Sequence, residues 1–288
     1  MYDLYKIKDI KNLLQKYNFK FSKGLGQNFI SNKYLCPKIV SKCDISDQTG
    51  IIEIGPGVGI LTCELADKAK KVVSVEIDRN LLPILRETTS QYNNIKFINE
   101  DILKINLKEL ISREFDEFLD LKVCSNLPYY ITSQVIIKLL ESETKINSLI
   151  LMVQKEAAER ICALPGSREC GSISLFVQYY ADAEILFNVS KGNFIPIPKV
   201  DSSVIKITKN PHKSLNIKDK NIFFRVVKST FLHRRKVILS SLNKEFNIDK
   251  DEISKILSFC GISKFSRPEQ LSFDGFVNLS NSIYDRII

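Results

Sequence analysis

The residues Asn126, Leu127, Pro128 and Tyr129 bring an amide side chain, a turn and an aromatic ring together within four positions. The Asn126 side-chain oxygen and a backbone carbonyl, expected to be that of Leu127, can accept both N–H bonds of an exocyclic amino group. Pro128 fixes the turn and offers no competing N–H. Tyr129 provides a flat face on which a flipped-out base can stack. The tetrapeptide indicates a site that makes an adenine N6 lone pair available for attack on a methyl donor.

This chemistry needs no strong general base, since orientation and proximity carry most of the rate. Taken alone, the same four residues also fit an ordinary turn between a strand and a helix, with the tyrosine in the core. Phe194 is a second candidate for stacking on the base, because Pro196 and Pro198 stiffen the loop that follows it. An isolated phenylalanine is more often a core residue, and the loop setting favours the functional interpretation.

A glycine-rich turn, Gly55–Gly59, follows one apolar run and precedes another. In an α/β sheet this is the first crossover, where glycines let the backbone approach a ligand. Glu76 ends the second apolar run and Asp101 follows the third. An acid after the second strand accepts hydrogen bonds from ribose hydroxyls, and the next acid can accept from an adenine amino group. The series predicts a nucleoside-containing cofactor.

These residues resemble those of the class I S-adenosylmethionine methyltransferases. A nicotinamide-dependent dehydrogenase remains an alternative, because both classes use the same crevice of the fold. The pyrophosphate of a dinucleotide favours the spacing G-x-G-x-x-G. In Gly55–Gly59 the third glycine comes one residue early, which favours the methyltransferase.

The elements that position these residues alternate between short β-branched runs and helical patterns, which predicts a doubly wound α/β sheet. The expected strands are Gly50–Ile54, Val72–Ile77, Ile95–Ile98, Leu121–Ser125, Ser148–Val153, Glu184–Val189 and Ser203–Thr208. The expected helices are Ile60–Ala69, Arg79–Thr88, Ser133–Ser142, Lys155–Ala163 and Ser172–Ala181. The last two strands are too close for a crossover helix, so we expect an antiparallel pair at an edge.

The composition changes after Thr208, and Lys209–Asn216 is expected to be a connector. The remainder is helical by pattern, with expected helices at Asp219–Leu232, Arg235–Glu245, Lys250–Cys260 and Glu269–Ile283. We therefore predict an S-adenosylmethionine-binding catalytic domain over residues 1–208, with a basic N-terminal extension, and an all-α domain over residues 209–288.

The charge of +9 is uneven, with nine lysines and two acids in residues 1–42 and a basic cluster at His233–Lys236. Such concentration favours a polyanionic partner, although a solubilising lysine face is the alternative. Seven scattered cysteines and two distant histidines do not form a metal-binding pattern, so no metal is expected. The chain has no apolar run of transmembrane length and no secretory signal pattern, and a cytoplasmic location is expected.

Nearly the whole chain from Lys23 onward resembles the bacterial KsgA-type rRNA adenine-N6,N6-dimethyltransferases. The matching stretches are Gly24–Phe29, Glu53–Gly57, Asn126–Tyr129, Gln154–Glu156, Phe194–Ser202 and His233–Lys236. One departure is Cys170-Gly171, where a Tyr-Gly pair is expected. The family implies a seven-stranded Rossmann-like sheet with a small C-terminal helical domain.

The resemblance also implies roles for individual residues. S-adenosylmethionine would lie against Asn28, Ile30, Gly55, Glu76, Asp101 and Asn126. The target adenine would be bound by Asn126 with Leu127 and sandwiched by Tyr129 and Phe194. The implied substrate is a pair of adjacent adenosines in a hairpin loop near the 3′ end of 16S rRNA, in a 30S subunit or its precursor. The basic N-terminal region and the helical domain would bind rRNA, and a monomer is expected.

Three rivals remain. An Erm-type enzyme, which methylates one 23S rRNA adenine, shares the Asn126–Tyr129 motif, but the Phe194–Ser202 stretch and the Arg234–Lys236 cluster favour the KsgA type. A non-catalytic ribosome-assembly factor on the same fold would not need Asn126 or Glu76. A DNA adenine methyltransferase usually carries two prolines where this chain has Leu127-Pro128.

Overall fold

The computed structural model describes residues 2–115, 120–210, 216–232, 234 and 236–288. Its internal contacts form two compact units. The first contains Met1–Ala158 and Asp182–Lys209, and the second contains Glu159–Ala181 and Asn210–Ile288. The first unit ends at Lys209, beside the expected boundary. The second unit also takes in Glu159–Ala181, which the sequence pattern places in the first domain.

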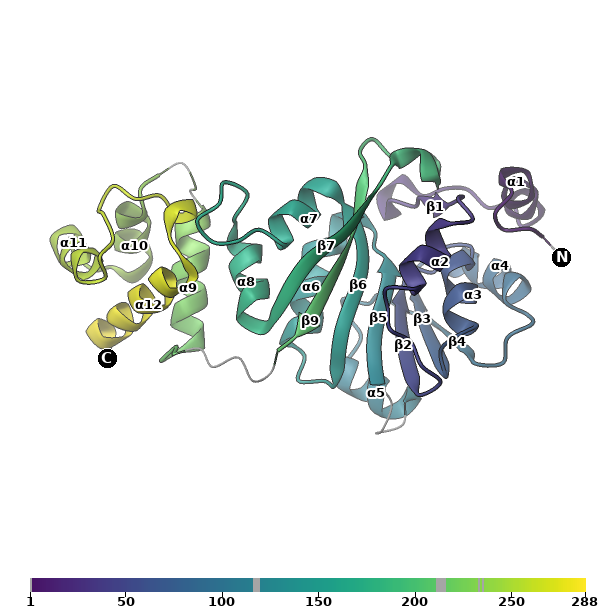
Figure 1. Ribbon diagram of the computed structural model, residues 1–288, viewed down its shortest axis with the longest axis horizontal. Coiled ribbons are helices and arrows are strands. Elements are labelled where there is room, and N and C mark those ends of the chain that lie inside the picture. Colours follow the sequence, from purple (N-terminus) through teal and green to yellow (C-terminus); the bar gives the residue numbers. More distant parts are fainter. Residues whose placement is uncertain (1, 116–119, 211–215, 233, 235) are drawn as a thin grey trace. The chain divides into compact units, whose positions relative to one another are not determined.

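A seven-stranded sheet in the order β4-β3-β2-β5-β6-β9-β7 forms the centre of the first unit (Figure 1). Its strands are β2 (Thr49–Ile54), β3 (Lys71–Glu76), β4 (Ile95–Asn99), β5 (Asp120–Asn126), β6 (Ile146–Gln154), β7 (Ala181–Val189) and β9 (Ser202–Lys209). All seven expected strands are present, which confirms the Rossmann-like class. Strands β2 to β6 pair in parallel, so their carboxyl ends meet at one edge.

β9 pairs antiparallel with β6 and lies between β6 and β7. The last two strands are therefore neighbours, as expected, but only β7 forms the edge. A separate two-stranded sheet joins β1 (Phe29–Ile30) to β8 (Phe194–Ile195). Neither short strand is predicted from the sequence, because two residues are too few to show a periodicity.

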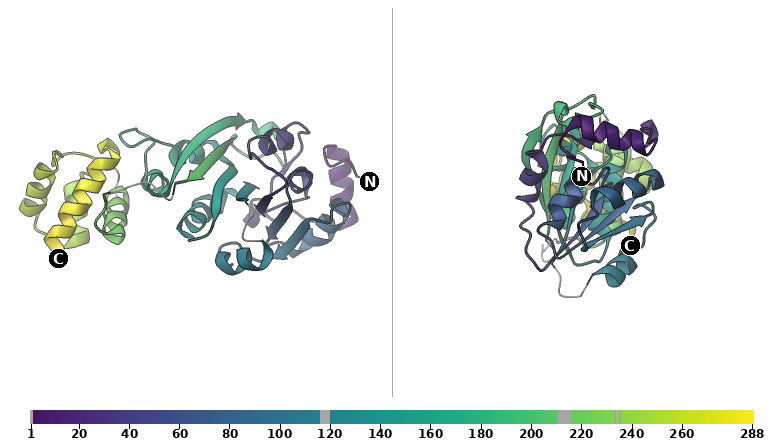
Figure 2. Two further views of the ribbon diagram at one scale, coloured as in Figure 1. Left: turned by 60° about the horizontal axis from the view of Figure 1, so that its bottom comes forward. Right: turned by 90° about the vertical axis from the view of Figure 1, so that its right-hand side faces the viewer.

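Helices lie on both sides of the large sheet (Figures 1 and 2). Those of the first unit are α1 (Ile7–Lys16), α2 (Leu35–Val40), α3 (Ile60–Ala66), α4 (Leu82–Thr88), α5 (Leu107–Glu114), α6 (Thr132–Glu141) and, extending into the second unit, α7 (Lys155–Ile161). The helices α1, α2 and α5 are additions to the predicted set. In α1 the side chains of Ile10, Leu13 and Leu14 are buried, which is the spacing of one helical face.

The second unit contains α8 (Ser172–Tyr180), α9 (Lys220–Leu232), α10 (Ile238–Phe246), α11 (Lys250–Phe259) and α12 (Phe273–Ile287). Leu175 and Cys170 share one apolar core with Phe223 and Phe276, which explains why α8 belongs to this unit. The expected helix starts at Arg235 and Glu269 are wrong. Of the basic cluster, His233 and Arg235 lie outside the described residues, as do residues 211–215 of the connector.

The two late helix starts have local causes. Val237 has extended backbone angles, so α10 begins at Ile238, and the N–H group of Ile238, which is free within the helix, donates to the Ser266 carbonyl at 3.0 Å. The Ser272 hydroxyl accepts from the Gly275 N–H group at the start of α12. Within the described part of the chain, no helix has the length and apolar character needed to span a membrane.

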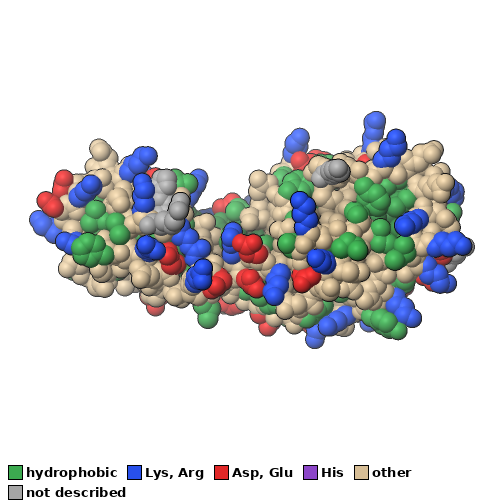
Figure 3. All heavy atoms as spheres, turned by 90° about the horizontal axis from the view of Figure 1, so that it is seen from above, with side chains coloured by type: hydrophobic (Ala, Val, Ile, Leu, Met, Phe, Trp, Pro, Cys, Tyr) green, Lys and Arg blue, Asp and Glu red, His purple; other side chains and the backbone are tan. Residues whose placement is uncertain are grey.

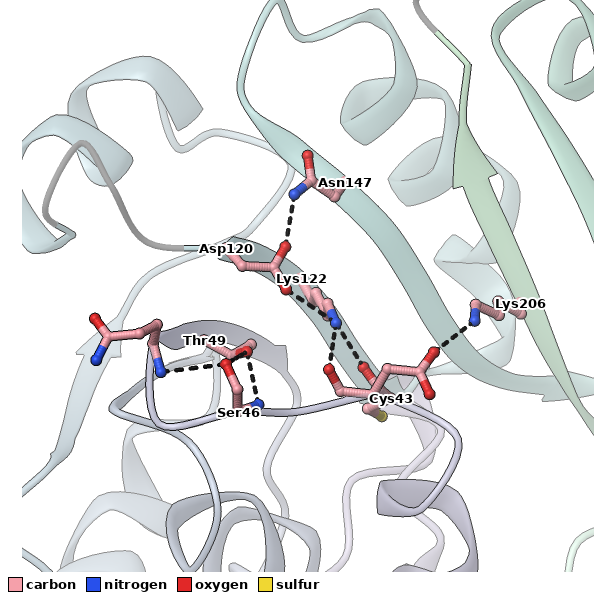
Figure 4. Close-up of polar contacts among 9 residues, drawn as sticks. Cys43, Ser46, Thr49, Asp120, Lys122, Asn147 and Lys206 are labelled. Atoms are coloured by element: carbon pink, nitrogen blue, oxygen red, sulfur yellow. Dashed lines mark hydrogen bonds and ion pairs between the residues drawn. The ribbon is translucent and has the colours of Figure 1, made fainter.

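The buried Lys122 joins the loop after α2 to the start of β5, and Lys206 in the carboxyl half of β9 joins the same loop (Figure 4). Lys122 Nζ donates to the carbonyl oxygens of Cys43 and Asp44 at 2.9 and 2.6 Å and lies 3.0 Å from an Asp120 carboxylate oxygen. Lys206 pairs with the Asp44 carboxylate at 2.9 Å. A buried ammonium group requires such compensation. This cluster holds the start of β5, at the end of the strand opposite Asn126.

Candidate active site

A cavity of about 250 Å³ lies at the carboxyl ends of the parallel strands, where ligands bind in open α/β sheets. The residues predicted from the sequence that line it are Asn28, Ile30, Gly55, Glu76, Asp101, Asn126, Leu127 and Tyr129. These residues come from five separate segments of the chain. The fold therefore brings the glycine turn, the two acids and the tetrapeptide to one place.

Two glycines bring the turn close to its neighbours. Gly57 has φ +62°, and a Cβ atom there would lie 2.9 Å from the Phe29 ring. Gly55 has φ +70°, and a Cβ atom there would be 3.6 Å from Pro128. Side chains at these positions would be strained, and at Gly57 would collide with β1. The turn and the Asn126–Tyr129 motif consequently form adjoining walls of the cavity.

Glu76, the last residue of β3, is a buried carboxylate at this cavity. Its Oε1 atom accepts from the Asp78 N–H group at 2.8 Å, and the N–H groups of Gly57 and Ile77 also stabilise its charge. Burial outweighs these bonds and raises the pKa of Glu76 to about 7. A carboxylate so poorly hydrated favours partners that donate hydrogen bonds, such as the paired hydroxyls of a ribose.

Glu53 is a second buried carboxylate, and the sequence analysis assigns it no role. Its Oε2 atom accepts from the hydroxyls of Thr62 and Ser74, both at 2.7 Å. Burial raises the pKa of Glu53 to about 7, and the nearby negative charge of Glu76 adds to the effect. Its signal in the sequence is an acid at the end of an otherwise apolar strand, immediately before the glycine turn.

The wall beyond β4 is partly apolar. Asp101 accepts from the Leu103 N–H group through Oδ1 at 2.9 Å, and its carboxylate has a second oxygen for an adenine amino group. Ile77, Ile102 and Tyr130 also line the cavity and are absent from the predicted site. Apolar faces beside an acid suit a purine ring, which needs both stacking surface and an acceptor.

Asn126 is held from three directions at the end of β5. Its Nδ2 atom donates to the Asn28 carbonyl at 3.2 Å, which directs the amide so that Oδ1 serves as the acceptor. The next residue, Leu127, donates its N–H to the Met152 carbonyl at 3.0 Å. The preceding Ser125 hydroxyl accepts from the Ile54 N–H group at 2.8 Å. These bonds join the tetrapeptide to β2, β6 and the N-terminal segment.

The two predicted stacking residues have different surroundings. Tyr129 is partly buried, lines the cavity, and shares a 2.8 Å hydrogen bond between its hydroxyl and that of Ser202. Burial raises the pKa of Tyr129, so the phenol stays neutral. Phe194 is only 1% exposed and packs in the core beside β1, outside the cavity lining. Its predicted stacking role would require β8 to move.

The N-terminal segment is fastened over the cavity by side chains that the sequence analysis does not single out for this purpose. Gln27 donates through Nε2 to Asp78 at 2.8 Å, and its Oε1 accepts from the Ser22 N–H group at 2.8 Å. Asn32 donates through Nδ2 to the Asn193 side chain at 2.6 Å, beside the β1–β8 pair. The segment therefore contacts both the β3 end and the β8 loop.

No group of three or more His, Cys, Asp or Glu side chains in the described residues could hold a metal ion. The described site offers carboxylates, an amide and aromatic rings instead. This donor set suits a nucleoside cofactor with hydroxyl and amino groups.

Glu53 makes a testable contribution to stability. In the folded protein the pKa of Glu53 is about 7, above its ordinary value of 4.5. The free energy of unfolding of the wild type therefore falls as the pH rises from 4.5 to 7. The Glu53→Gln variant keeps an oxygen for Thr62 and Ser74 but cannot ionise. We expect it to exceed the wild type by up to about 3 kcal/mol in unfolding free energy at pH 8 and to match it near pH 4.5.

Urea unfolding at both pH values measures this difference. The exposed Glu141→Gln variant is the control and should follow the wild type throughout. A Glu53→Gln variant that is equally destabilised at both pH values would contradict the assignment of burial as the cause.

Sequence comparison identifies the chain's relatives. Residues 18–285 match the family model of ribosomal RNA adenine dimethylase. The ribosomal RNA small subunit methyltransferase A of Bacillus mycoides is 42% identical over 276 residues, covering 95% of this chain and 94% of the relative. The enzyme of the same name from Bacillus cereus has the same identity and coverage.

Structural comparison gives the same fold. A dimethyladenosine transferase from Plasmodium falciparum matches with a TM-score of 0.75 and 24% identity, covering 90% of this chain and 98% of the other. The 23S rRNA methyltransferase ErmE matches with a TM-score of 0.67 and 23% identity, covering 89% and 99%. The expected resemblance is confirmed, and the chain belongs to the ribosomal RNA adenine dimethylase family.

Proposed function

We propose that this enzyme transfers methyl groups from S-adenosylmethionine to N6 of two adjacent adenosines in a hairpin loop near the 3′ end of 16S rRNA. Each adenosine would become N6,N6-dimethyladenosine. The observation that carries the proposal is the Asn126 amide, which the Asn28 carbonyl orients at a cavity that also contains Glu76 and Asp101. The names of the 42% identical small-subunit methyltransferases support the choice of substrate.

The residues at the cavity fit S-adenosylmethionine. Glu76 would accept from the ribose hydroxyls, Asp101 from the adenine amino group, and Gly55 would let the backbone approach the cofactor. Asn28 and Ile30 would lie along its methionine part. When bound, the cofactor supplies a methyl group attached to a positively charged sulfur.

The chain's own residues position the target base. Asn126 Oδ1 and the Leu127 carbonyl accept the two N6–H bonds, which turns the nitrogen lone pair toward the methyl donor. The partly buried Tyr129 ring stacks on the flipped-out base, and its hydroxyl bond to Ser202 keeps the ring fixed. The proton leaves N6 for water after transfer, so no charged general base is needed.

Phe194 remains a proposed second stacking face. Its ring is buried beside β1 in this structure. Contact with the base therefore requires a shift of the β8 loop, where Pro196 and Pro198 limit the available conformations. The base itself, by entering the cavity, would supply the free energy for this shift.

The substrate is a 30S subunit or its precursor, and the protein acts on it in the cytoplasm as a monomer. The lysines of residues 1–42 and the helical unit supply rRNA contacts, since Lys8, Lys11 and Lys20 are exposed. A loop target suits such an enzyme, because unpaired bases can be splayed and stacked.

Two alternatives make different predictions. An Erm-type enzyme would methylate 23S rRNA, and the likeness to ErmE, at 23% identity, concerns the fold alone. A non-catalytic assembly factor would bind 30S subunits without transferring methyl groups. The converging positions of Asn126, Glu76 and Asp101 favour catalysis over binding alone.

The direct test incubates the protein and labelled S-adenosylmethionine with unmethylated 30S subunits, and in parallel with 23S rRNA. Label recovered as N6,N6-dimethyladenosine from 16S rRNA is the expected result. Label only in 23S rRNA would favour the Erm-type alternative. Tight 30S binding without label in either RNA would indicate an assembly factor.

Asn126→Ala removes the proposed N6 acceptor and should lower methyl transfer at least about 100-fold, the scale of losing one transition-state hydrogen bond. Single-turnover transfer to 30S subunits measures the rate, and 30S binding should remain within about twofold. The exposed Asn147→Ala variant, at the start of β6, is the matched control. Transfer by Asn126→Ala at a rate near that of the wild type would overturn the mechanism.

Stacking is tested by side-chain truncation at Tyr129 and Phe194. Each alanine variant should reduce methyl transfer by about 5- to 100-fold, because base stacking contributes about 1–3 kcal/mol. Tyr129→Phe keeps the ring and loses only the Ser202 bond, so it should retain most activity. Full activity of Tyr129→Ala would exclude the Tyr129 ring as a stacking face. If the lower activity of Phe194→Ala were explained by lower thermal stability, Phe194 would be a core residue only.

A further inference from the structure

Two phenylalanine rings of the second unit are almost fully in solvent. Phe259, the last residue of α11, is 86% exposed, and Phe265 is 72% exposed. A single exposed apolar side chain is normal on a protein surface and is not evidence of a site by itself. The surroundings of Phe265 add the evidence for a binding role.

Phe265 lies in a hydrogen-bonded turn, Ser263–Ser266, here called the Phe265 turn. The Ser266 N–H group donates to the Ser263 carbonyl at 2.9 Å, and the Phe265 N–H group donates to the Ser263 hydroxyl at 3.3 Å. The Ser266 carbonyl in turn accepts from the Ile238 N–H group at 3.0 Å. The turn is therefore attached to the segment that precedes α10, and it presents the ring to solvent.

The start of the turn is fixed as well. Gly261 follows the end of helix α11 and its C-cap residue Cys260, and its φ of +68° reverses the chain. The Ile262 N–H group donates to the Leu257 carbonyl at 2.8 Å, which is a standard closure of a helix C-terminus. A ring held in a preformed turn loses little conformational entropy when a ligand stacks on it.

Basic residues are concentrated in and beside the Phe265 turn, in the stretch of sequence between Glu252 and Glu269. The stretch from Ile253 to Pro268 contains Lys255, Lys264 and Arg267 and no acid. Lys264 Nζ lies 5.2 Å from the centre of the Phe265 ring. Lys236, on the segment joined to the turn through Ile238, is also exposed. The second unit, at the left of Figure 3, shows hydrophobic side chains among charged side chains of both signs.

We propose that the Phe265 turn binds RNA by stacking an unpaired base on the Phe265 ring while Lys264 contacts an adjacent phosphate. An aromatic face beside cations is the pattern of single-stranded nucleic-acid sites, where every base offers a π face. A protein partner would favour a broader apolar patch with a polar rim. This inference rests on the proposed function, because it supplies a second contact to the same rRNA through the second unit.

The test compares variants that separate stacking from general apolar contact. Phe265→Ala should weaken binding to unmethylated 30S subunits by about 5- to 100-fold. Phe265→Trp should bind as tightly as the wild type, and Phe265→Leu should bind as weakly as Phe265→Ala. Phe259→Ala removes a phenyl group that is still more exposed and lies outside the turn; it is the matched control and should bind like the wild type. Lys264→Ala should make the affinity less dependent on salt, by a slope of about one.

Methyl transfer is measured on the same samples. At saturating 30S subunits Phe265→Ala should keep the wild-type rate, since the turn lies outside the cavity lining. Failure of the wild type to methylate would reject the proposed function. The affinities of the variants for 30S subunits would still test the role of the Phe265 turn. The stacking proposal would be overturned if Phe265→Ala or Phe265→Leu bound 30S subunits as tightly as the wild type. It would also be overturned if Phe259→Ala lost as much affinity as Phe265→Ala. A Phe265→Ala variant that lost affinity for 30S subunits but not for protein-free 16S rRNA would contradict it as well.

Discussion

The site depends on keeping a carboxylate buried at the end of β3. Burial of Glu76 disfavours its charge enough to raise its pKa to about 7, although three backbone N–H groups donate to it. One of these comes from Gly57, whose turn cannot accept a side chain beside Phe29. The glycine turn, β1 and the β3 end are therefore constrained together. A ligand with paired hydroxyls relieves the unfavourable burial by donating hydrogen bonds to the carboxylate.

The N-terminal segment contacts both the Asn126–Tyr129 motif and the loop after β3. The Asn28 carbonyl orients the Asn126 amide, and Gln27 bonds to Asp78, two residues beyond Glu76. One short segment thus contacts two walls of the cavity. A cofactor bound against this segment would also stabilise the orientation of the Asn126 amide. Binding in one half of the cavity would then prepare the other half for its ligand.

Much of the sheet could be predicted because β-branched runs such as Val72–Val75 have a clear pattern and end at recognisable turns. The β1–β8 pair could not, since it depends on contacts between residues 29–30 and 194–195 rather than on any local signal. In the site, Glu76 and Asn126 stand at predictable strand ends. The hydrogen bond of Tyr129 to Ser202 and the burial of Phe194 arise from tertiary packing, which the proline-rich loop after Phe194 does not reveal.

The most direct measurement is the affinity for S-adenosylmethionine, by calorimetry, of the wild type and Glu76→Gln at pH 6 and pH 8. The ratio of the two proteins' affinities removes any titration of the ligand itself. Because the pKa of Glu76 is about 7, the ionised acceptor dominates at pH 8, and the wild-type advantage should shrink about tenfold at pH 6. An advantage that is the same at both pH values, or absent at both, would contradict the role of a buried carboxylate in holding the cofactor.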